Sequence, residues 1–528
     1  MMRLIAVQRI LGALLMAFSI FMLMPLGVSY LYSATSWSDL LSISFLLSGD
    51  GAARPFLFAF ATIFLVGVAL WGPVRKTGAG IDLKIRDGFL VVSAFWLGLG
   101  LAGSVPLLMM DQLDMSVTDA VFESISGLTT TGATVISGLD DLPKSILFYR
   151  QMLQWLGGMG IIVLAVAVLP MLGIGGMQLY RAETPGPVKD SKLTPRIAKT
   201  AKALWAIYLF ITIACGLAYY AAGMDPFDAV AHSFSTVAIG GFSTHDASLG
   251  YFEHSAVEYV AILFMLIAGM NFSLHFVAWS RIRLGVPLIM RGWRPAWRRT
   301  AGSVNPRHLF GGYGDDPEFR AYLQILFFLS LVSVTYLHFE GMYPSWTDAM
   351  RDGVFQVVSI GTTTGFTTAD FSLWHGPLPV LLIFASFIGG CAGSTGGGMK
   401  VIRWLLIVRQ SNRELMRLLH PSAEIPVKLG GRAVPQRVME AAWGFFSAYI
   451  AVFAFFMTIL MFTGLDQVTS FSAVAASLNN LGPGLGEVAS NYATINSPAK
   501  WVCVLAMVLG RLEIFTLLVL ITPEFWRR

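Results

Sequence analysis

The segment DAVFESISGLTTTGAT, residues 119–134, has two further copies in the chain: DAVAHSFSTVAIGGFST at 228–244 and DGVFQVVSIGTTTGFTT at 352–368. Each copy begins with Asp, continues with Ala or Gly and then Val, and has a glycine thirteen residues after the Asp. These glycines are Gly132, Gly241 and Gly365. A divergent fourth copy, SLNNLGPGLGE around Gly482, has Thr469 in place of the Asp. The shared register predicts four copies of one structural unit.

The rest of the chain is too apolar for a water-soluble protein. Of its 528 residues, 55% are hydrophobic and 13% are charged, whereas about 25% of the residues in a typical soluble domain are charged. No stretch has the apolar and polar alternation of an outer-membrane barrel. The composition predicts an all-α integral membrane protein. Ten apolar segments are long enough to cross a bilayer, at about 20 residues each: 4–30, 55–73, 88–110, 146–172, 201–222, 256–280, 321–339, 378–408, 438–463 and 499–521.

The charged residues predict how these spans are oriented. Most Lys and Arg residues lie in alternate connections and at the two termini, whereas the opposite connections are acidic. The positive-inside rule therefore makes both termini cytoplasmic. The basic connections are 75–86, 181–202, 281–320 and 400–437. The first apolar run is longer than a signal-peptide core and no small-residue cleavage site follows it, so we expect a retained span.

Each repeated segment combines about ten helix-compatible residues with a short Thr- and Gly-rich stretch and a polar return. Non-helical backbone at membrane depth occurs only where protein buries it or water lines it. The pattern therefore predicts a re-entrant pore helix followed by an extended filter strand. Glycine permits positive φ, so that neighbouring carbonyls can turn to one side and replace the water shell of a cation. A single TTTG could be an ordinary turn, but four copies between spans favour a ring of uncharged oxygens that suits a large monovalent cation.

At this point the chain resembles the Trk/Ktr/HKT superfamily of potassium transporters, and most closely its TrkH-type bacterial subunits. The motifs are TTTGAT at 129–134, STVAIGGFSTHD at 235–246, TTTGFTT at 362–368, NNLGPGLG at 479–486 and GRLEIFT at 510–516. The resemblance covers the chain from about residue 85 onward. It implies four span, pore-helix, span units in a pseudo-fourfold arrangement around a central pore. The implied divisions are 1–84 for two extra amino-terminal spans, and 85–180, 181–307, 308–432 and 433–528 for the four units.

The resemblance also implies partners and a location. Members of this family occur in the bacterial inner membrane, commonly as homodimers in which each protomer conducts. A cytoplasmic regulatory subunit of the TrkA type is expected to bind nucleotide, NAD or ATP/ADP. This chain itself is expected to need no cofactor, and potassium is its substrate.

Carried over by position, the family's potassium-binding filter falls on four short strands. Its residues would be Thr130, Thr131, Gly132, Ala133, Ile239, Gly240, Gly241, Phe242, Thr363, Thr364, Gly365, Phe366, Asn480, Leu481, Gly482 and Pro483. Most strands match only one of the two glycines of the tetrameric channel motif. Glycine at all four central positions resembles the potassium-preferring members, because relatives that admit sodium tend to have serine in the first strand.

A run of glycines interrupts the span predicted at 378–408. Its sequence is GGCAGSTGGGMK, residues 389–400, and each glycine costs about 1 kcal/mol relative to Ala inside a helix. A phosphate-binding loop would need Ser or Thr directly after GK, and Met399 separates Gly398 from Lys400. The remaining interpretations are a flexible kink and the family's intramembrane gate. The implied gate residues are Gly389, Gly390, Gly393, Ser394, Thr395, Gly396, Gly397, Gly398 and Arg511.

Two charged residues lie at depths where charge is costly. Arg511 is expected either to face the pore below the filter, as the resemblance implies, or to pair with an acidic side chain. Glu123, inside the first pore helix, could supply negative potential near the filter, cap a helix end or form a buried pair. His232 and His245 are expected to be structural.

Three function classes fit these observations. They are a gated potassium-conducting uptake subunit, the ion-translocating subunit of a potassium-pumping ATPase, and a proton- or sodium-coupled potassium symporter. The first is favoured, because the GFSTHDAS segment at 241–248 and the paired amino-terminal spans look like the Trk branch. No HExxH or GxSxG motif occurs, so we expect that the chain is not an enzyme.

Overall fold

A computed structural model of the chain describes residues 4–33, 52–75, 85–163, 197–279 and 313–527. Helices dominate the described residues, and the one β-element is a hairpin of β1 (Lys428–Leu429) and β2 (Arg432–Ala433) with Lys428 opposite Ala433. The predicted all-α membrane fold is confirmed. The basic connections predicted at 181–202 and 281–320 lie largely outside the described residues, as do the unit boundaries near 84, 180 and 307.

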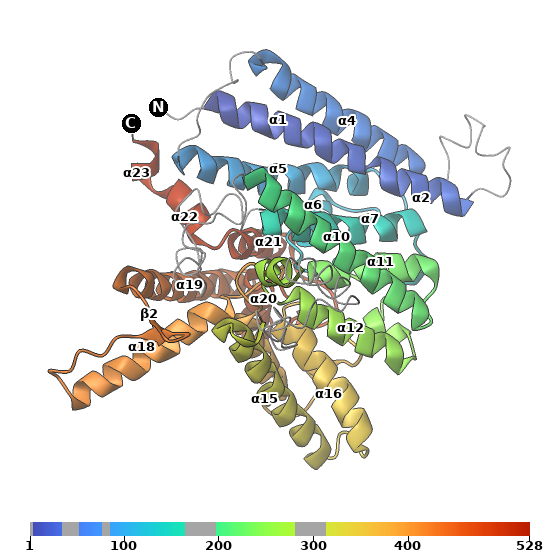
Figure 1. Ribbon diagram of the computed structural model, residues 1–528. Coiled ribbons are helices and arrows are strands. Elements are labelled where there is room, and N and C mark those ends of the chain that lie inside the picture. Colours follow the sequence, from blue (N-terminus) through green and yellow to red (C-terminus); the bar gives the residue numbers. More distant parts are fainter. Residues whose placement is uncertain (1–3, 34–51, 76–84, 164–196, 280–312, 528) are drawn as a thin grey trace, which may run out of the picture.

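Four sets of helices surround a common centre, and each set contains a short helix directed toward that centre (Figure 1). The first set is α5 (Ile85–Leu108), α6 (Val117–Leu128) and α7 (Lys144–Val163), and the second is α10 (Ile197–Ala221), α11 (Pro226–Ala238) and α12 (Ser255–Ala268). The third is α15 (Pro317–Phe339), α16 (Trp346–Gly361) and α17 (Leu378–Ile388), followed by α18 (Val401–Leu419). The fourth is α19 (Gln436–Phe462), α20 (Gln467–Leu478) and α21 (Ser497–Arg511), followed by α22 (Phe515–Ile521) and α23 (Pro523–Trp526). Single 3-10 turns are η2 (Gly72–Val74), η3 (Leu139–Asp141), η5 (Ser248–Tyr251), η7 (Phe371–Leu373) and η8 (Gly486–Val488).

The four short helices, α6, α11, α16 and α20, begin in the same way. A side chain at the N-cap accepts a backbone N–H of the first turn in each of them; the caps are Ser116, Asp225, Ser345 and Asp466. Such caps satisfy donors that a helix cannot pair internally. Local sequence therefore fixes where each of these helices starts.

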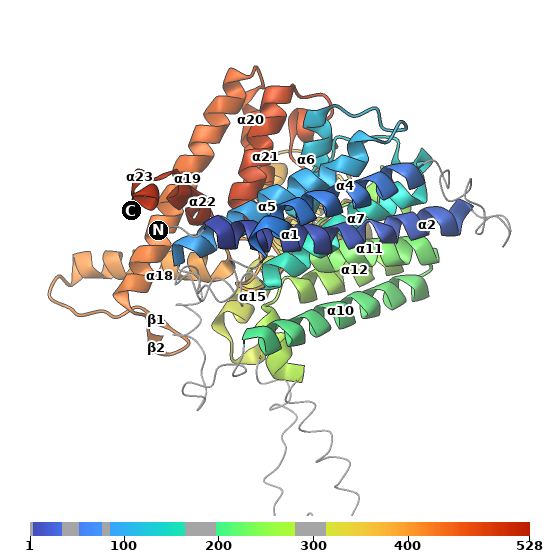
Figure 2. The same ribbon diagram turned by 90° about the horizontal axis from the view of Figure 1, so that it is seen from above.

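The amino-terminal helices form a separate pair outside the four units. α1 (Leu4–Phe21) continues into α2 (Leu23–Ser33), and α4 (Ala53–Trp71) packs along α1 beside α5 (Figures 1 and 2). Gly12 and Gly67 meet at the crossing, where an added Cβ on either residue would lie within 3 Å of the backbone oxygen of the other. Small residues allow this close approach of membrane helices.

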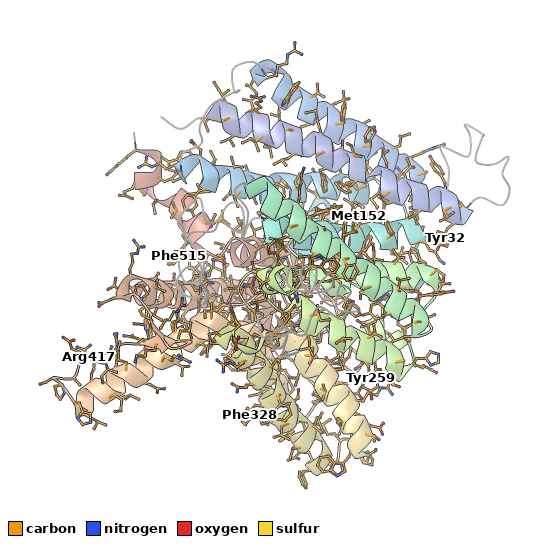
Figure 3. All side chains as sticks on the ribbon, in the orientation of Figure 1. Tyr32, Met152, Tyr259, Phe328, Arg417 and Phe515 are labelled. Carbon is orange, nitrogen blue, oxygen red and sulfur yellow. The ribbon has the colours of Figure 1, made fainter. Side chains whose placement is uncertain are left out.

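Apolar side chains cover the outer surface as well as the interior. Phe328 and Tyr259 are 62% and 59% exposed at the periphery, whereas Met152 is fully buried (Figure 3). Six described helices are long and apolar enough to cross a membrane, and two further pairs of helices pass the same test together. An apolar exterior of this kind suits a lipid environment.

Within the described residues the second spans of units 2, 3 and 4 are broken, whereas the sequence predicted a break in unit 3 alone. The expected break in unit 3 separates α17 from α18. The spans predicted at 256–280 and 499–521 also bend, by 91° after Ala268 and by 113° after Arg511. The second bend uses positive φ at Glu513 and Ile514, residues that give no glycine signal. The span predicted at 378–408 is not one helix: α17 ends at Ile388, and α18 starts at Val401 and extends away from the units toward the exposed Arg417 (Figure 3).

The contact between Gly12 and Gly67 gives a prediction for stability. Gly67→Leu should lower the free energy of unfolding by about 1–3 kcal/mol, because the new side chain would overlap backbone atoms of α1. Thermal unfolding of purified protein in detergent measures the change. Gly27→Leu is the matched control, since nothing lies within 4 Å of a Cβ at Gly27. Equal melting temperatures for the two variants would contradict the packing.

Candidate functional site

The four segments 130–133, 239–242, 363–366 and 480–483 share one backbone conformation and are here called the strand ring. The residue two places before each central glycine has positive φ: Thr130 (52°), Ile239 (54°), Thr363 (68°) and Asn480 (54°). The central glycines also have positive φ: Gly132 (81°), Gly241 (78°), Gly365 (83°) and Gly482 (97°). Non-glycine residues adopt this conformation only where the surroundings impose it. The repeat found in the sequence is therefore also a repeat of backbone geometry.

Each strand also begins with the same hydrogen bond. The N–H just before the central glycine donates to a carbonyl near the end of its own short helix, at 2.8, 2.9, 2.7 and 2.8 Å. The four pairs are Thr131 to Ser126, Gly240 to Ser235, Thr364 to Ser359 and Leu481 to Ala476. These bonds connect the carboxyl end of each short helix to the strand that follows. The negative end of each helix dipole thus faces the ring.

The strands close into a ring through their glycines. A Cβ on Gly132 would lie 2.1 Å from the oxygen of Gly240, one on Gly241 would lie 2.1 Å from that of Thr364, and one on Gly365 would lie 2.1 Å from that of Leu481. A Cβ on Gly482 would lie 2.7 Å from the oxygen of Thr131, which returns to the first strand. Each unit therefore contacts the next in the order 1, 2, 3, 4, 1. The structure thus brings all sixteen residues of the expected filter together around one centre.

A cavity of about 570 Å³ opens on one side of the ring. The four central glycines line it together with polar residues of the connections, among them His245, Asp246 and Asp370. His245 forms a charged cluster with two aspartates beside this cavity. His245 Nδ1 lies 2.5 Å from Asp140 Oδ1, and His245 Nε2 lies 3.3 Å from Asp228 Oδ2. Burial alone would lower the pKa of His245, but the hydrogen bonds to Asp228 and Asp140 outweigh it and raise this pKa. His245 therefore serves as a bridge between connections of units 1 and 2, which agrees with a structural role.

Residues 389–400 form a folded loop on the other side of the ring, here called the glycine loop. Gly397 N donates to Thr363 Oγ1 at 2.7 Å, and Gly398 N donates to the carbonyl oxygen of Asn479 at 3.1 Å. Thr395 Oγ1 donates to Val237 O at 3.0 Å. The loop thus contacts three units directly beneath the strands. It is a built structure rather than a simple bend in a continuous helix.

A carboxyl group of α15 and the broken end of α12 hold the base of the glycine loop. Glu318 accepts hydrogen bonds from Ala392 N at 2.7 Å and from Ile402 N at 3.2 Å. The broken end of α12 adds a bond from Cys391 N to Gly269 O at 2.9 Å. Non-helical backbone at this depth is therefore satisfied by other non-helical backbone and by one buried carboxylate, as the absence of water from a bilayer requires.

Arg511 reaches the glycine loop from the end of α21. Its Nη1 donates to Thr395 O at 3.1 Å, and its side chain is 4% exposed. Within the described ranges no carboxylate forms an ion pair with it, whereas the nearby Glu513 pairs with Arg403 at 2.7 Å. The Nε and Nη2 atoms of Arg511 have no partner among the described residues. It lines a cavity of about 50 Å³ together with Lys400 and the glycine loop.

Glu123 pairs with Arg150, so of the alternatives left open by the sequence the buried ion pair is observed. His232 is fully buried and contacts Asp228 O and Ser243 Oγ at 2.9 and 3.0 Å.

Sequence reasoning missed Arg150 and Gln154. A basic residue within the span predicted at 146–172 was a usable signal for Arg150, whereas Gln154 gave none. Among the described residues no group of His, Cys, Asp and Glu could hold a metal ion.

These features define a multi-pass membrane protein in which four units meet in one ring of strands. The model of the TrkH family, described as "Cation transport protein", matches residues 53–294 and 323–528. The chain belongs to this family.

Individual relatives agree over nearly the whole length. The chain is 56% identical over 522 residues to the Trk system potassium uptake protein TrkH of Vibrio parahaemolyticus, with 99% of each chain covered. It is 50% identical to TrkH of Escherichia coli K12 with the same coverage, and 41% identical to TrkG of that strain, over 89% of this chain and 91% of TrkG. The crystal structure of the potassium transporter TrkH from Vibrio parahaemolyticus superposes with a TM-score of 0.84 at 52% identity, covering all of both chains. All of these relatives are named as transporters, in line with the expectation that the chain is not an enzyme.

Closure of the strand ring can be tested through Gly365. Gly365→Ala combines an unfavourable positive φ with overlap against Leu481 O, so its melting temperature should fall further than that of a variant with strain alone. Gly341→Ala provides that comparison, because Gly341 has φ 71° and nothing within 4 Å of its added Cβ. Strain alone costs about 1–2 kcal/mol. An equal loss of stability in the two variants would argue against the contact between units 3 and 4.

Proposed function

We propose that the chain conducts potassium ions across the bacterial inner membrane for uptake. The observation that carries this proposal is the ring of four glycines, each against a carbonyl of the next strand, because such a ring offers uncharged oxygens from four sides to one ion. The printed names of the relatives, potassium uptake proteins of the Trk system, support it. The filter is then made of the sixteen residues of the strand ring, with potassium as the transported substrate.

Two other functions share this architecture: a subunit of a potassium-pumping ATPase and a proton- or sodium-coupled symporter. Coupling would need a titratable group along the ion path, and the strand ring contains none. Gated conduction is therefore the simplest function that these residues support.

The glycine loop acts as the gate in this proposal, together with Arg511. The loop lies beneath the strands and carries hydrogen bonds to Thr363 and Asn479, so an ion leaving the ring would meet it. Control by a cytoplasmic TrkA-type subunit that binds NAD or ATP/ADP, and assembly as a homodimer, belong to the same proposal. We also propose that both termini are cytoplasmic. The proposed division of the chain is 1–84, 85–180, 181–307, 308–432 and 433–528. Arg86 Nη1 donates to Arg527 O at 2.9 Å, which brings the chain end next to the basic start of α5 and supports cytoplasmic placement of both.

The filter is tested by Gly132→Ser in liposomes. The added side chain would overlap the strand of unit 2 and displace its oxygens, so the potassium-to-sodium permeability ratio should fall by about tenfold. Reversal potentials under separately varied potassium, sodium and proton gradients measure the ratio and also distinguish conduction from coupling. Gly138→Ser is the control, with similar φ (74°) and nothing nearby. An unchanged ratio in folded Gly132→Ser protein would exclude the filter assignment.

The gate is tested by Arg511→Ala. A positive charge at 4–8 Å raises the barrier to a cation by about 2–4 kcal/mol at an effective dielectric constant near 20, so its removal should increase potassium flux. Because Arg511 has no carboxylate partner in the described residues, thermal stability should change little.

Arg351→Ala is the control for the gate. This change leaves the buried Glu258 without its partner, away from the glycine loop, and should lower stability by about 1–3 kcal/mol with unchanged flux per folded molecule. Slower flux in Arg511→Ala would mean that this arginine is needed for permeation rather than for closure.

A further inference from the structure

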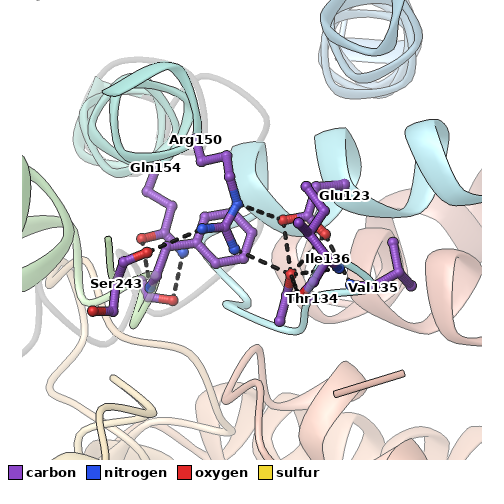
Figure 4. Close-up of polar contacts among 9 residues, drawn as sticks. Glu123, Thr134, Val135, Ile136, Arg150, Gln154 and Ser243 are labelled. Atoms are coloured by element: carbon purple, nitrogen blue, oxygen red, sulfur yellow. Dashed lines mark hydrogen bonds and ion pairs between the residues drawn. The ribbon is translucent and has the colours of Figure 1, made fainter. Parts of the chain in front are cut away.

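A charged pair lies behind the strand ring, between α6 and α7. Glu123 Oε1 and Arg150 Nε are 2.8 Å apart, and the side chains are 0% and 1% exposed (Figure 4). Removing two charges from water is costly, and their attraction offsets this cost only when further hydrogen bonds complete the pair. The remaining bonds of the two side chains therefore identify what the pair holds in place.

The carboxylate of Glu123 holds the return of the first strand. Thr134 Oγ1 donates to it, with 3.0 Å to each oxygen, and Val135 N donates to Oε2 at 3.0 Å. Thr134 lies two residues after Gly132, and its carbonyl oxygen accepts a bond from Tyr492 N of unit 4 at 2.8 Å. Glu123 thus fixes the residue at which the first strand leaves the ring and meets unit 4.

The guanidinium of Arg150 extends the same network to the second strand. Its Nη2 lies 3.1 Å from Thr134 Oγ1 and its Nη1 donates to Ser243 O at 3.0 Å. Its Cζ is 4.2 Å from the centre of the Phe242 ring. Ser243 lies two residues after Gly241, which is the position that Thr134 has after Gly132. One side chain therefore joins equivalent positions of two units.

Gln154, one helical turn beyond Arg150 on α7, adds to the hold on the second strand. Its Nε2 donates to Gly240 O at 2.6 Å and its Oε1 accepts from Phe242 N at 3.1 Å (Figure 4). Gly240 O is the oxygen against which Gly132 packs. One face of α7 thus sets both sides of the contact between strands 1 and 2.

The other units have no equivalent ion pair at this place. The residue four positions after the repeated Asp is Glu123 in unit 1, His232 in unit 2 and Gln356 in unit 3, and Ala473 occupies the matching place in unit 4. His232 bonds to Ser243 Oγ and Gln356 bonds to Ala369 O. The repeated Asp228 and Asp352 accept from the hydroxyls of Thr244 and Thr368, without an arginine at this place. Ion pairs also join other units, as between Lys500 and Asp119 and between Arg351 and Glu258. Among the described ion pairs, only Glu123 with Arg150 has both side chains at most 1% exposed and bonds to the residues two places after the central glycines. Its charge-assisted bonds are stronger than neutral ones.

We propose that Arg150 and Glu123 are positioning residues for ion selection, which set the separation of strands 1 and 2 at Gly132 and Gly241. The proposal rests on potassium conduction through the strand ring, as proposed above. Selection among cations depends on the number and placement of the oxygens around the ion, so a shift at one junction changes the ring for every ion that passes. Neither side chain needs to touch the ion.

The experiment compares three variants in liposomes by reversal potential. Arg150→Lys keeps the charge but cannot make the forked contacts to Thr134 and Ser243. Glu123→Gln with Arg150→Gln removes both charges and leaves the net charge unchanged, so a general field effect is absent. Thr134→Val removes only the hydroxyl between the pair and the first strand, and is the mildest change to folding.

The control is a second ion pair, Glu258 with Arg351. These residues connect α12 to α16, their atoms approach to 2.5 Å, and their described hydrogen bonds go only to each other. Glu258→Gln with Arg351→Gln should lower thermal stability without changing selectivity. Glu258 is 1% exposed and Arg351 is 35% exposed. The control therefore separates loss of an ion pair from loss of strand position.

Arg150→Lys and the double neutral variant should lower the potassium-to-sodium permeability ratio by about tenfold, and Thr134→Val should lower it less, in the same direction. Permeability ratios equal to that of the wild type in both Arg150→Lys and Thr134→Val would overturn the positioning role. The proposed function would still stand in that case if the wild type and the Glu258/Arg351 control were selective for potassium. A wild-type protein without potassium selectivity would instead refute the proposed function itself.

Discussion

The close approach of each central glycine to a carbonyl of the next strand is the constraint on which the rest of this structure depends. A Cβ at these positions would lie 2.1–2.7 Å from an oxygen, so only hydrogen fits between neighbouring strands. Four such contacts close a ring from four parts of the chain that lie far apart in sequence. Everything around the ring is arranged to hold non-helical backbone at membrane depth, where unpaired polar groups are costly.

Two kinds of hydrogen-bonding support stabilise this non-helical backbone. On the side of the larger cavity, side chains behind the strands bond to the returns, and in unit 1 they form the charged network of Glu123 and Arg150. On the opposite side, the broken second spans supply backbone to one another, as when Cys391 N donates to Gly269 O. The breaks in units 2 and 4 are thus part of the same solution as the glycine loop. A single interrupted helix would leave polar groups of the loop without partners.

Charge is distributed unequally between these two sides. Behind the first strand a cation and an anion are both fully paired, whereas beneath the ring Arg511 has one hydrogen bond to the glycine loop and two nitrogens without a described partner. An arginine in such surroundings repels a neighbouring cation, and its incomplete hydrogen bonding is a cost to the fold rather than a support for it. This contrast is the physical basis for assigning position to Arg150 and closure to Arg511.

The sequence by itself determined the membrane class, the four short helices with their caps, and the fourfold register, because these follow from composition, local hydrogen bonding and fixed spacing. It also marked the break at 389–400, since glycine weakens a helix wherever it occurs. Tertiary structure alone decided the bends after Ala268 and Arg511, the pairing of Glu123 with Arg150 rather than a cap, and the role of Gln154. Those features depend on which distant segment packs against each residue. Glu513 and Ile514 have no local preference for positive φ, so the sequence does not predict the bend at these residues. The order of units around the ring was likewise set by contacts between glycines and carbonyls that only the folded chain brings together.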